Sequence, residues 1–584
     1  MLDDLTAAEQ QFIRAAARGQ AVDLRVGDAA DDEPGLGASW SSGRTIRAEI
    51  VARLLMDTEA RSPVRLAGAR IAGSLSLEGA MLVRWLLLVD CWLDEPVVLT
   101  HATAPLIRMT GCHLPGLHAE NLCVHADLAL DHGFTAHGEV ELARARVGGV
   151  LSLAGARLDN PGATALDAGR LTVDHHVRLD AGFTARGEVC LTGARISGDL
   201  VLTGAQLTNP GNTALAAGQL HVAQSMTADE LRAEGGIHLA GAEIGGSLTL
   251  TGASLARARD WALTASGLQV AQETQLTHGF TASGGIDLRG AHLGALILDG
   301  GELDNPDGNA LEGGWLTVDR QVSGRQGFTA RGEFSLYGAH IGTRVDLRDA
   351  TFTNPGDLAL DFERLNTPAL YLLPRNSPDG RVDLSHAKVG TLYDDSATWP
   401  DQIDLRGLTY TALINEHVSV RERLNWLERQ PAGYAPQPYD QLATAYRQAG
   451  QEDAARLVAI HKHRRRRRTL NPAGRLLSRL LYLTVGYGYR TWLAALWLLA
   501  LLALGTAVFD HAHPAHMIAI GKPAPAFHPV TYTLDVLLPI VDLGQQKAWL
   551  PTGSALYWFW LFSGAGWVLT TAVAAGLSGV LKRD

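Results

Sequence analysis

The chain has 584 residues, with 50 lysines and arginines against 61 aspartates and glutamates, a formal net charge of −11. This acidic balance argues against a nucleic-acid-binding protein, which would present a basic surface, so no nucleic-acid partner is predicted. Apolar residues make up 46% of the chain, which excludes a disordered chain. Its four cysteines form no C-x-x-C pair, which excludes a disulfide scaffold and a zinc ribbon.

Residues 1–60 are predicted to form a helical N-terminal cap. Leu5, Phe12 and Ala16 share one helical face, and Thr6 with Glu9 three residues later forms a capping box. Residues 44–56 repeat the helical spacing of apolar residues. Because the end of a stacked repeat leaves its apolar core open, a cap is expected where the repeats begin.

Residues 61–413 carry an internal repeat. Phe134 lies 49 residues before Phe183, and Phe280 lies 48 residues before Phe328, each within a Gly-Phe-Thr-Ala motif. A second marker is the turn sequence Asn-Pro-Gly or Asn-Pro-Asp-Gly, at 160–162, 209–211, 305–308 and 354–356. A period of this length indicates a repeat architecture that grows by adding units to one continuous body.

Each repeat is predicted to build short strands. In Asp199-Leu200-Val201-Leu202 the leucines alternate with other residues, which is the period of a β-strand. The alanines of the recurring Ala-x-Leu pattern are too small for an ordinary core, but they fit where the next coil stacks at about 4.8 Å. No amphipathic helix separates the units, which disfavours a leucine-rich repeat or a β/α barrel. The expected fold class is mainly β, a parallel β-solenoid of roughly 15–17 coils of about 20 residues each.

The triplets Ala194-Arg195-Ile196, Ala205-Gln206-Leu207 and Ala242-Glu243-Ile244 resemble the Ala-x-Leu core of pentapeptide-repeat proteins. The resemblance implies a right-handed quadrilateral β-helix. Ala194 and Ala205 are eleven residues apart where that family has five or ten, so some corners must hold an extra residue. The longer pattern resembles a bacterial family of membrane-bound repeat proteins, common in actinobacteria and often named membrane-associated oxidoreductases. This second resemblance covers nearly the whole chain.

Two segments follow the repeats. Residues 414–463 contain three helical stretches and are predicted to be a C-terminal cap and linker. Residues 464–490 are a basic juxtamembrane segment, which opens with a run of five arginines: Arg464, Arg465, Arg466, Arg467 and Arg468. Because this run precedes an apolar stretch, its expected partner is a lipid bilayer with anionic headgroups.

Two uncharged apolar stretches are predicted to be transmembrane helices, at 491–509 and 555–578. The first would be about 28 Å long, enough to cross the hydrocarbon core. Lysines and arginines concentrate before the first span and in the tail 579–584, whereas the loop 510–554 carries only Lys522 and Lys547. The positive-inside rule therefore predicts a multi-pass protein of the inner (cytoplasmic) membrane with both termini cytosolic. Small residues four apart on the second span would permit a homo-oligomer.

The loop 510–554 contains two groups of candidate site residues. His511, His513 and His516 are of the kind that binds zinc or copper, but Pro514 breaks any regular face, and we predict no metal there. The apolar segment 529–544 is too short to span. Either it is an interfacial helix at the outer leaflet, or it is a re-entrant pore loop carrying the residues Asp535, Asp542 and Gly544. Its Ile-Val-Asp-Leu-Gly sequence at 540–544 departs from the Thr-Val-Gly-Tyr-Gly filter of potassium channels.

The sequence offers no support for catalysis. It contains no complete G-x-G-x-x-G, no Walker A loop, no H-E-x-x-H and no G-x-S-x-G, and neither predicted span has a histidine to hold haem. We therefore predict no catalytic residues and no cofactor, and we favour a protein that is not an enzyme. The predicted function is a membrane-anchored, cytosolic β-solenoid that acts as a scaffold or interaction surface for an unidentified protein. The alternatives are an oligomeric two-span ion channel with a regulatory solenoid and, by resemblance alone, a membrane-associated oxidoreductase.

Overall fold

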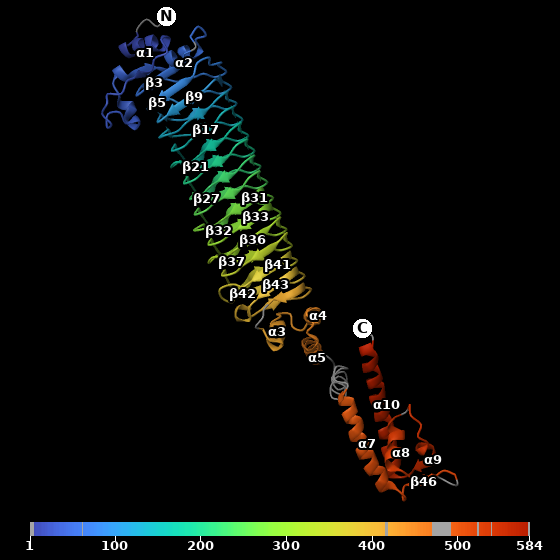
Figure 1. Cartoon of the computed structure of the whole chain (residues 1–584). Helices are drawn as coiled ribbons and strands as arrows, with labels where there is room; N and C mark the ends of the chain where they lie inside the picture. Colours follow the sequence, from blue (N-terminus) through green and yellow to red (C-terminus); the bar gives the residue numbers. More distant parts are fainter. Residues whose placement is uncertain are drawn as a thin grey trace. The chain divides into compact units, whose positions relative to one another are not determined.

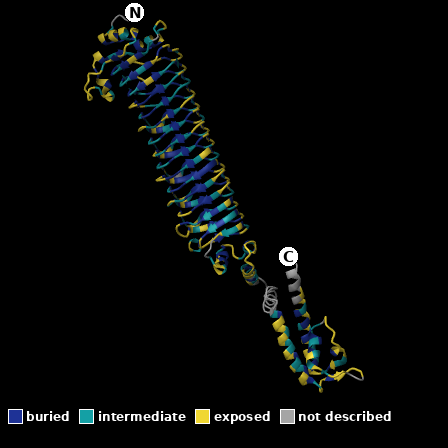
Figure 2. Cartoon of the chain, viewed as in Figure 1, coloured by how far each residue is buried: buried dark blue, intermediate teal, exposed yellow. Residues whose placement is uncertain are grey.

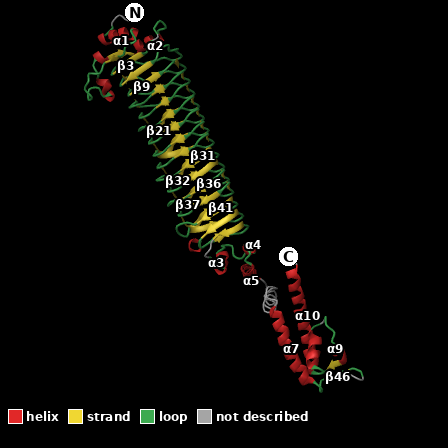
Figure 3. Cartoon of the chain, in the orientation of Figure 1, coloured by secondary structure: helices red, strands yellow, loops and turns green. Residues whose placement is uncertain are grey.

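The computed structural model describes residues 5–60, 62–414, 418–469, 492–521, 525–538 and 540–581. The chain divides into two compact units. The first comprises Met1–Val418 with Arg429–Pro431, and the second comprises Ser419–Glu428 with Ala432–Asp584. The first is built mainly of strands and the second mainly of helices (Figure 1, Figure 3).

The first unit is a parallel β-solenoid of about 16 turns, as predicted. Its strands pair in parallel with strands of the neighbouring coils, in sheets of 26 and 19 strands within the described residues. One coil consists of β12 (Cys123–Val124), β13 (Leu128–Ala129), β14 (Thr135–Ala136) and β15 (Val140–Glu141). The first two strands belong to one sheet and the last two to the other, so each coil has four faces, as in a pentapeptide-repeat-like fold.

Long and short coils alternate, which explains the period of the sequence. Arg146 of β16 (Arg146–Val147) pairs with Thr172 of β19 (Thr172–Val173), and Thr172 pairs with Arg195 of β22 (Arg195–Ile196). More residues separate Arg146 from Thr172 than separate Thr172 from Arg195. One long and one short coil therefore make one repeat, and Arg146 and Arg195 occupy equivalent positions in successive repeats. Both kinds of coil are longer than expected, because the corners and one face carry additional residues.

The extra residues of the long coils form a turn, which carries the Asn-Pro-Gly or Asn-Pro-Asp-Gly motif in four cases and neither motif in Ser254–Thr264. These turns interrupt the five longest strands, which are β18 (Arg157–Asp167), β24 (Gln206–Ala216), β30 (Ser254–Thr264), β34 (Glu302–Glu312) and β40 (Thr351–Asp361). In β18 the side-chain amide of Asn160 donates to the carbonyl of Thr164 at 2.7 Å. Gly187 of the next coil, with φ of 118°, lies so close that a Cβ would overlap the carbonyl oxygens of Asn160 and Ala163. The turn of one coil can therefore pack closely on the next coil only because that coil has a glycine at this position.

Buried residues recur from coil to coil along the solenoid (Figure 2), and most of them are apolar. Leu200 and Leu202, which alternate along the sequence, both face the core and are fully buried, whereas Arg195 of the same coil is exposed. The phenylalanines of the Gly-Phe-Thr-Ala motif, Phe134, Phe183, Phe280 and Phe328, are also fully buried. Each coil buries its neighbours' apolar side chains, so no coil has a complete core alone.

The N-terminal residues of the solenoid unit contain helices α1 (Ala7–Ala17) and α2 (Ala48–Met56). The capping box of Thr6 and Glu9 is present. Glu9 is 1% exposed and accepts from Arg47 at 2.8 Å, and this hydrogen bond lowers the pKa of Glu9 to about 2. Two strands of this segment, β1 (Val22–Asp23) and β2 (Thr45–Arg47), pair with β3 (Val64–Ala67) and β4 (Arg70–Ala72) of the first full coil.

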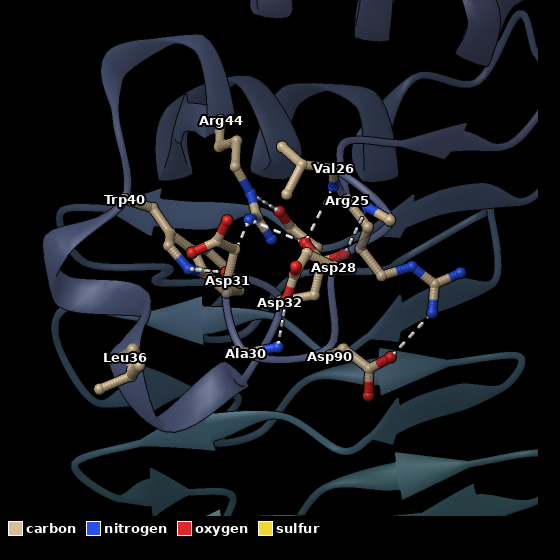
Figure 4. A network of polar contacts seen from close by, with 12 residues as sticks. Arg25, Val26, Asp28, Ala30, Asp31, Asp32, Leu36, Trp40, Arg44 and Asp90 are labelled. Atoms are coloured by element: carbon tan, nitrogen blue, oxygen red, sulfur yellow. Dashed lines mark hydrogen bonds and ion pairs between the residues drawn. The ribbon is translucent and has the colours of Figure 1, made fainter.

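A polar network fixes the loop between these two strands (Figure 4). The guanidinium of Arg44, 8% exposed, pairs with Asp32 at 2.9 Å and stacks on the ring of Trp40 at 3.6 Å. Arg25 reaches across to Asp90 of the solenoid at 3.0 Å. The buried arginine is thus balanced by a carboxylate, which makes the network a structural connection of the loop to the first coils.

The second unit contains the helices α3 (Val420–Leu427), α4 (Gln437–Gln448), α5 (Glu452–Thr469), α7 (Trp492–Ala512), α8 (Pro529–Leu537), α9 (Gln545–Ala548) and α10 (Ser554–Leu581). Among the described residues, one helix, Leu493–Ala512, is long and apolar enough to cross a membrane. It ends three residues later than the predicted span 491–509. The second predicted span lies within α10, and most side chains in the last part of that helix are outside the described residues.

Candidate functional site

Helices α7, α8 and α10 share a small apolar core. Phe509 of α7, Tyr532 of α8 and Phe562 of α10 are each fully buried. The ring centroid of Phe509 lies 4.9 Å from that of Tyr532 and 5.8 Å from that of Phe562. These contacts make the three helices one packed structure, which we call the C-terminal hairpin.

Two glycines bring α8 into close contact with the long helices. A Cβ on Gly505 of α7 would overlap the side chain of Thr533, and one on Gly566 of α10 would overlap the carbonyl of Leu537. Gly505 lies seven residues before the end of α7, about 10 Å along the helix axis. The short helix α8 therefore contacts α7 about two turns before its C-terminal end, and it also contacts α10.

The outer surface of the hairpin is apolar. On α7, Leu496, Leu499 and Leu504 are between 48% and 62% exposed, and on α10 Trp567 and Val568 are 60% and 65% exposed. Only 17% of the most apolar 18-residue stretch of α7 is buried within the described part of the protein. The core helix of a soluble protein would be mostly buried, whereas most of this helix is not buried within the described part of the chain.

The three residues of the possible pore loop, Asp535, Asp542 and Gly544, have different environments. Asp535 is 4% exposed, and its two carboxylate oxygens accept from the backbone amides of Leu543 at 2.8 Å and Gln546 at 2.7 Å. Asp542 is exposed and pairs with Lys547, whose hydrogen bond lowers the pKa of Asp542. Gly544 has φ of 78° and precedes α9. Asp535 thus fastens the loop after α8, and Asp542 faces solvent.

The three candidate metal ligands do not form a group. No set of three or more histidine, cysteine, aspartate or glutamate side chains that could hold a metal occurs in the described part of the chain. The ring of His513 stacks on Phe527 at 4.6 Å and meets the ring of Trp549 edge-on at 5.2 Å. His511 lies in the last turn of α7, and His516 comes after the helix ends.

The arginine run begins within α5. Arg465 pairs with Glu428, which follows the last turn of α3, and Lys462 pairs with Asp440 of α4 at 2.6 Å. Arg464 and Arg466 are at least partly exposed, whereas the side chains of Arg467 and Arg468 lie outside the described residues. The helices α3, α4 and α5 therefore use part of the basic segment for their own ion pairs.

A group of carboxylates lies on the last coils of the solenoid. Burial, together with the charges of Asp361, Glu312 and Asp357, raises the pKa of Glu333 to about 7. The pKa of Asp361 is also raised, mainly by burial. Sequence reasoning did not single out these residues, because the stacking that brings carboxylates of successive coils together depends on the coil register.

The chain matches no protein-family model, no curated protein and no solved structure in the comparisons.

Proposed function

We propose that this protein is a membrane-anchored scaffold, in which the C-terminal hairpin inserts into a bilayer and the solenoid offers its faces to a protein partner. The exposed apolar surface of α7 carries this proposal. Leucine side chains in water are unfavourable by about 25 cal/mol for each Å² of apolar surface, and lipid would remove that cost. The proposal agrees with the resemblance to membrane-bound repeat proteins. None of the candidate site residues described above supports an oxidoreductase activity.

The orientation follows from charge. The basic residues before α7, including Arg475, Arg479 and Arg490, and those after α10, Lys582 and Arg583, outnumber the two lysines between the helices. The positive-inside rule then places both termini and the solenoid in the cytosol, with the α8 loop on the outside of the inner membrane. The arginine run would lie near anionic headgroups.

The orientation is tested by cysteine labelling in intact cells. A membrane-impermeant maleimide should label Ile520→Cys, which is 51% exposed in the loop after α7. It should not label Asn212→Cys, at an exposed projecting turn of the solenoid, until the cells are opened. The parent chain is the control for its own four cysteines. The reverse pattern would reject the orientation, and extraction of the protein by alkaline carbonate would reject insertion.

The scaffold role is tested by recovery of partners from native membranes. Full-length protein is crosslinked in cells, solubilised and purified, and compared with a variant in which residues 1–413 are deleted. A partner retained by the full chain and lost with the solenoid is the expected result. Identical sets of proteins from both would show that the solenoid recruits nothing.

A second candidate function is an ion channel, and the packing of α8 favours it. A short helix held between two long ones, at Gly505 and Gly566, has the layout of a re-entrant segment. Two spans cannot enclose a pore alone, so several copies would be needed, joined through small residues such as Ala572 and Gly576 of α10. Asp542, the exposed acid, would then form a ring that favours cations.

Conductance of purified protein in planar bilayers separates the two candidates. The scaffold proposal expects no channel events from the wild type or from Asp542→Asn. Reproducible cation-selective steps that lose their selectivity in Asp542→Asn would replace the scaffold with the channel.

A further inference from the structure

One face of the solenoid contains a hollow of about 570 Å³. It lies over the strands β19, β22, β25 (His221–Val222) and β28 (Glu243–Ile244), which pair in register along the stack. Arg170 and Arg195 line one part of it and His221 and Glu243 line another, with Gly193 and Gly241 between them in the corner column. We call this feature the arginine hollow.

Two glycines at one corner of the coil, Gly193 and Gly241, contribute to the hollow. Residues at this corner have a left-handed backbone, with φ of 58° at Arg144, 56° at Arg170 and 55° at Gln219. In other coils of the stack the same corner is glycine, among them Gly193, Gly241, Gly267 and Gly290, with φ between 63° and 67°. The backbone is the same in each, so a glycine leaves space at this corner without a change of fold.

Arginines on the solenoid are of two kinds, those in an ion pair with a carboxylate and those without one. Arg289 pairs with Asp287 at 2.8 Å, Arg348 with Asp346 at 2.7 Å and Arg325 with Asp299 at 3.1 Å. In contrast, Arg146, Arg170 and Arg195 have no carboxylate partner within the described part of the chain. These three guanidinium groups lie on three successive coils of a chain whose net charge is −11.

The register places these charges at a defined spacing. Thr172 pairs with Arg146 on one side and Arg195 on the other, so the two arginines are two coils, or about 9.6 Å, apart along the stack. Arg170 lies at the corner of the coil between them. The carboxylate of Glu243 is held by His221 at 3.2 Å, at the other end of the hollow. The arginines are therefore available to an external anion.

We propose that the arginine hollow binds an acidic segment of a partner protein, with Arg170 and Arg195 gripping its carboxylates. This inference rests on the proposed scaffold function and names the chemistry of its partner. A guanidinium group matches a carboxylate with two parallel hydrogen bonds. Nucleic acid and membrane surfaces are bound by broad basic fields, whereas here two arginines line one part of an open hollow, so a short acidic protein segment is the occupant that fits.

Binding of a fluorescein-labelled decaglutamate peptide to the purified full-length protein tests the proposal by anisotropy. The wild type should bind, and less tightly as salt is raised. Arg170→Gln with Arg195→Gln should weaken binding by about tenfold per arginine. The matched control is Arg232→Gln with Arg331→Gln, which removes the same charge from two exposed arginines elsewhere on the solenoid and should change binding less than about twofold.

A second variant fills the hollow without removing charge. Gly193→Gln places at this corner the side chain that Gln219 already carries in a neighbouring position of the same column, with similar φ. It should weaken binding as the arginine pair does, while circular dichroism shows an unchanged fold. If Gly193→Gln binds normally, the peptide is not held in the hollow and the proposal fails.

Other outcomes also decide the question. Equal losses in the arginine pair and its control would show general attraction and reject the site, as would the absence of peptide binding. Binding of phosphatidylserine vesicles that requires Arg170 and Arg195, without binding of decaglutamate, would assign the face to lipid and overturn the proposal. The peptide assay does not depend on recovering a cellular partner, so a failed pull-down with intact peptide binding would count against the scaffold function alone.

Discussion

The solenoid and the C-terminal hairpin use similar apolar side chains in opposite ways. In the solenoid, Leu200 and Phe183 are fully buried by the coils on either side. In the hairpin, Leu499 is 62% exposed and Val568 is 65% exposed. The solenoid therefore completes its own core by repetition, whereas the hairpin has a small core and an apolar exterior, the feature on which the proposed membrane insertion rests.

Glycine also has different roles in the two regions. In the solenoid, Gly187 adopts φ of 118°, a backbone conformation that residues with a side chain rarely adopt, and it packs against a projecting turn of the neighbouring coil. In the hairpin, Gly505 and Gly566 lie in α-helices, where alanine would favour the helix by about 1 kcal/mol. They are explained by the close approach of α8. The same residue type marks a backbone requirement in one region and a packing requirement in the other.

The largest expected effect is on the solenoid core. Leu200→Asp should lower the free energy of unfolding by about 5 kcal/mol or more, because it removes buried apolar contacts and leaves an unpaired charge in the column. Arg195→Asp, on the exposed face of β22 in the same coil, should cost little. Guanidinium unfolding followed by circular dichroism measures both. Equal losses would mean that the inside–outside assignment is wrong.

The hairpin packing is tested by two glycines of one helix. Gly566→Ala should lower stability by about 2–3 kcal/mol, because the new methyl group overlaps the carbonyl of Leu537 and displaces α8. Gly564→Ala has no neighbour within reach and should be neutral or stabilising. Thermal unfolding in detergent micelles compares them. A neutral Gly566→Ala would show that α8 does not pack tightly on α10.

The loop after α8 depends on a buried carboxylate. Asp535→Asn should cost about 2 kcal/mol, because a neutral amide replaces the charged acceptor of two backbone N–H groups. Asp542→Asn, which changes an exposed pair with Lys547, should leave the melting temperature almost unchanged. The two melting temperatures are measured in the same detergent. A larger effect at Asp542 would reverse the roles assigned to these two acids.

The smallest expected effect is a pH dependence in the solenoid. The pKa of Glu333 is raised from 4.5 to about 7, so the folded protein loses stability as the pH rises through this interval and the carboxyl ionises. After allowance for partial exposure, Glu333→Gln should be more stable than the wild type by about 1 kcal/mol at pH 8 and equal to it at pH 4. Melting curves at several pH values, with the exposed Glu302→Gln as control, check this. A constant difference at all pH values would exclude ionisation as its cause.

Much of the solenoid is predictable from local pattern. The alternation at Leu200 and Leu202, the Gly-Phe-Thr-Ala motif and the Asn-Pro-Gly turns predict strands, corners and a long repeat, because each repeat recreates the same local environment. The pattern did not predict that long and short coils alternate, or that both exceed the expected length. The additional length lies in turns such as Asn160–Thr164, and their place on one face follows from the stacking of coils.

The hairpin and the candidate sites are less predictable. The length and apolar character of 491–509 are enough to propose a span. In the sequence, Asp535 and Asp542 look like equivalent acidic residues of one loop. Only the folded loop shows that Asp535 binds backbone amides while Asp542 is exposed. The arginine hollow cannot be recognised in the sequence, because Arg170 and Arg195 lie at different positions of successive coils and come together only when the coils stack.

The amino-acid sequence by itself therefore determined the repeat, its strand character, the inward leucines and the apolar C-terminal stretches, because each depends on a pattern of residues read along the chain. The tertiary structure alone decided the register between coils, the contact of α8 with Gly505 and Gly566, the burial of Asp535 and the positions of the unpaired arginines. These features depend on contacts between different coils, helices and loops, and the stacking and packing that bring those residues together leave no local periodic signal.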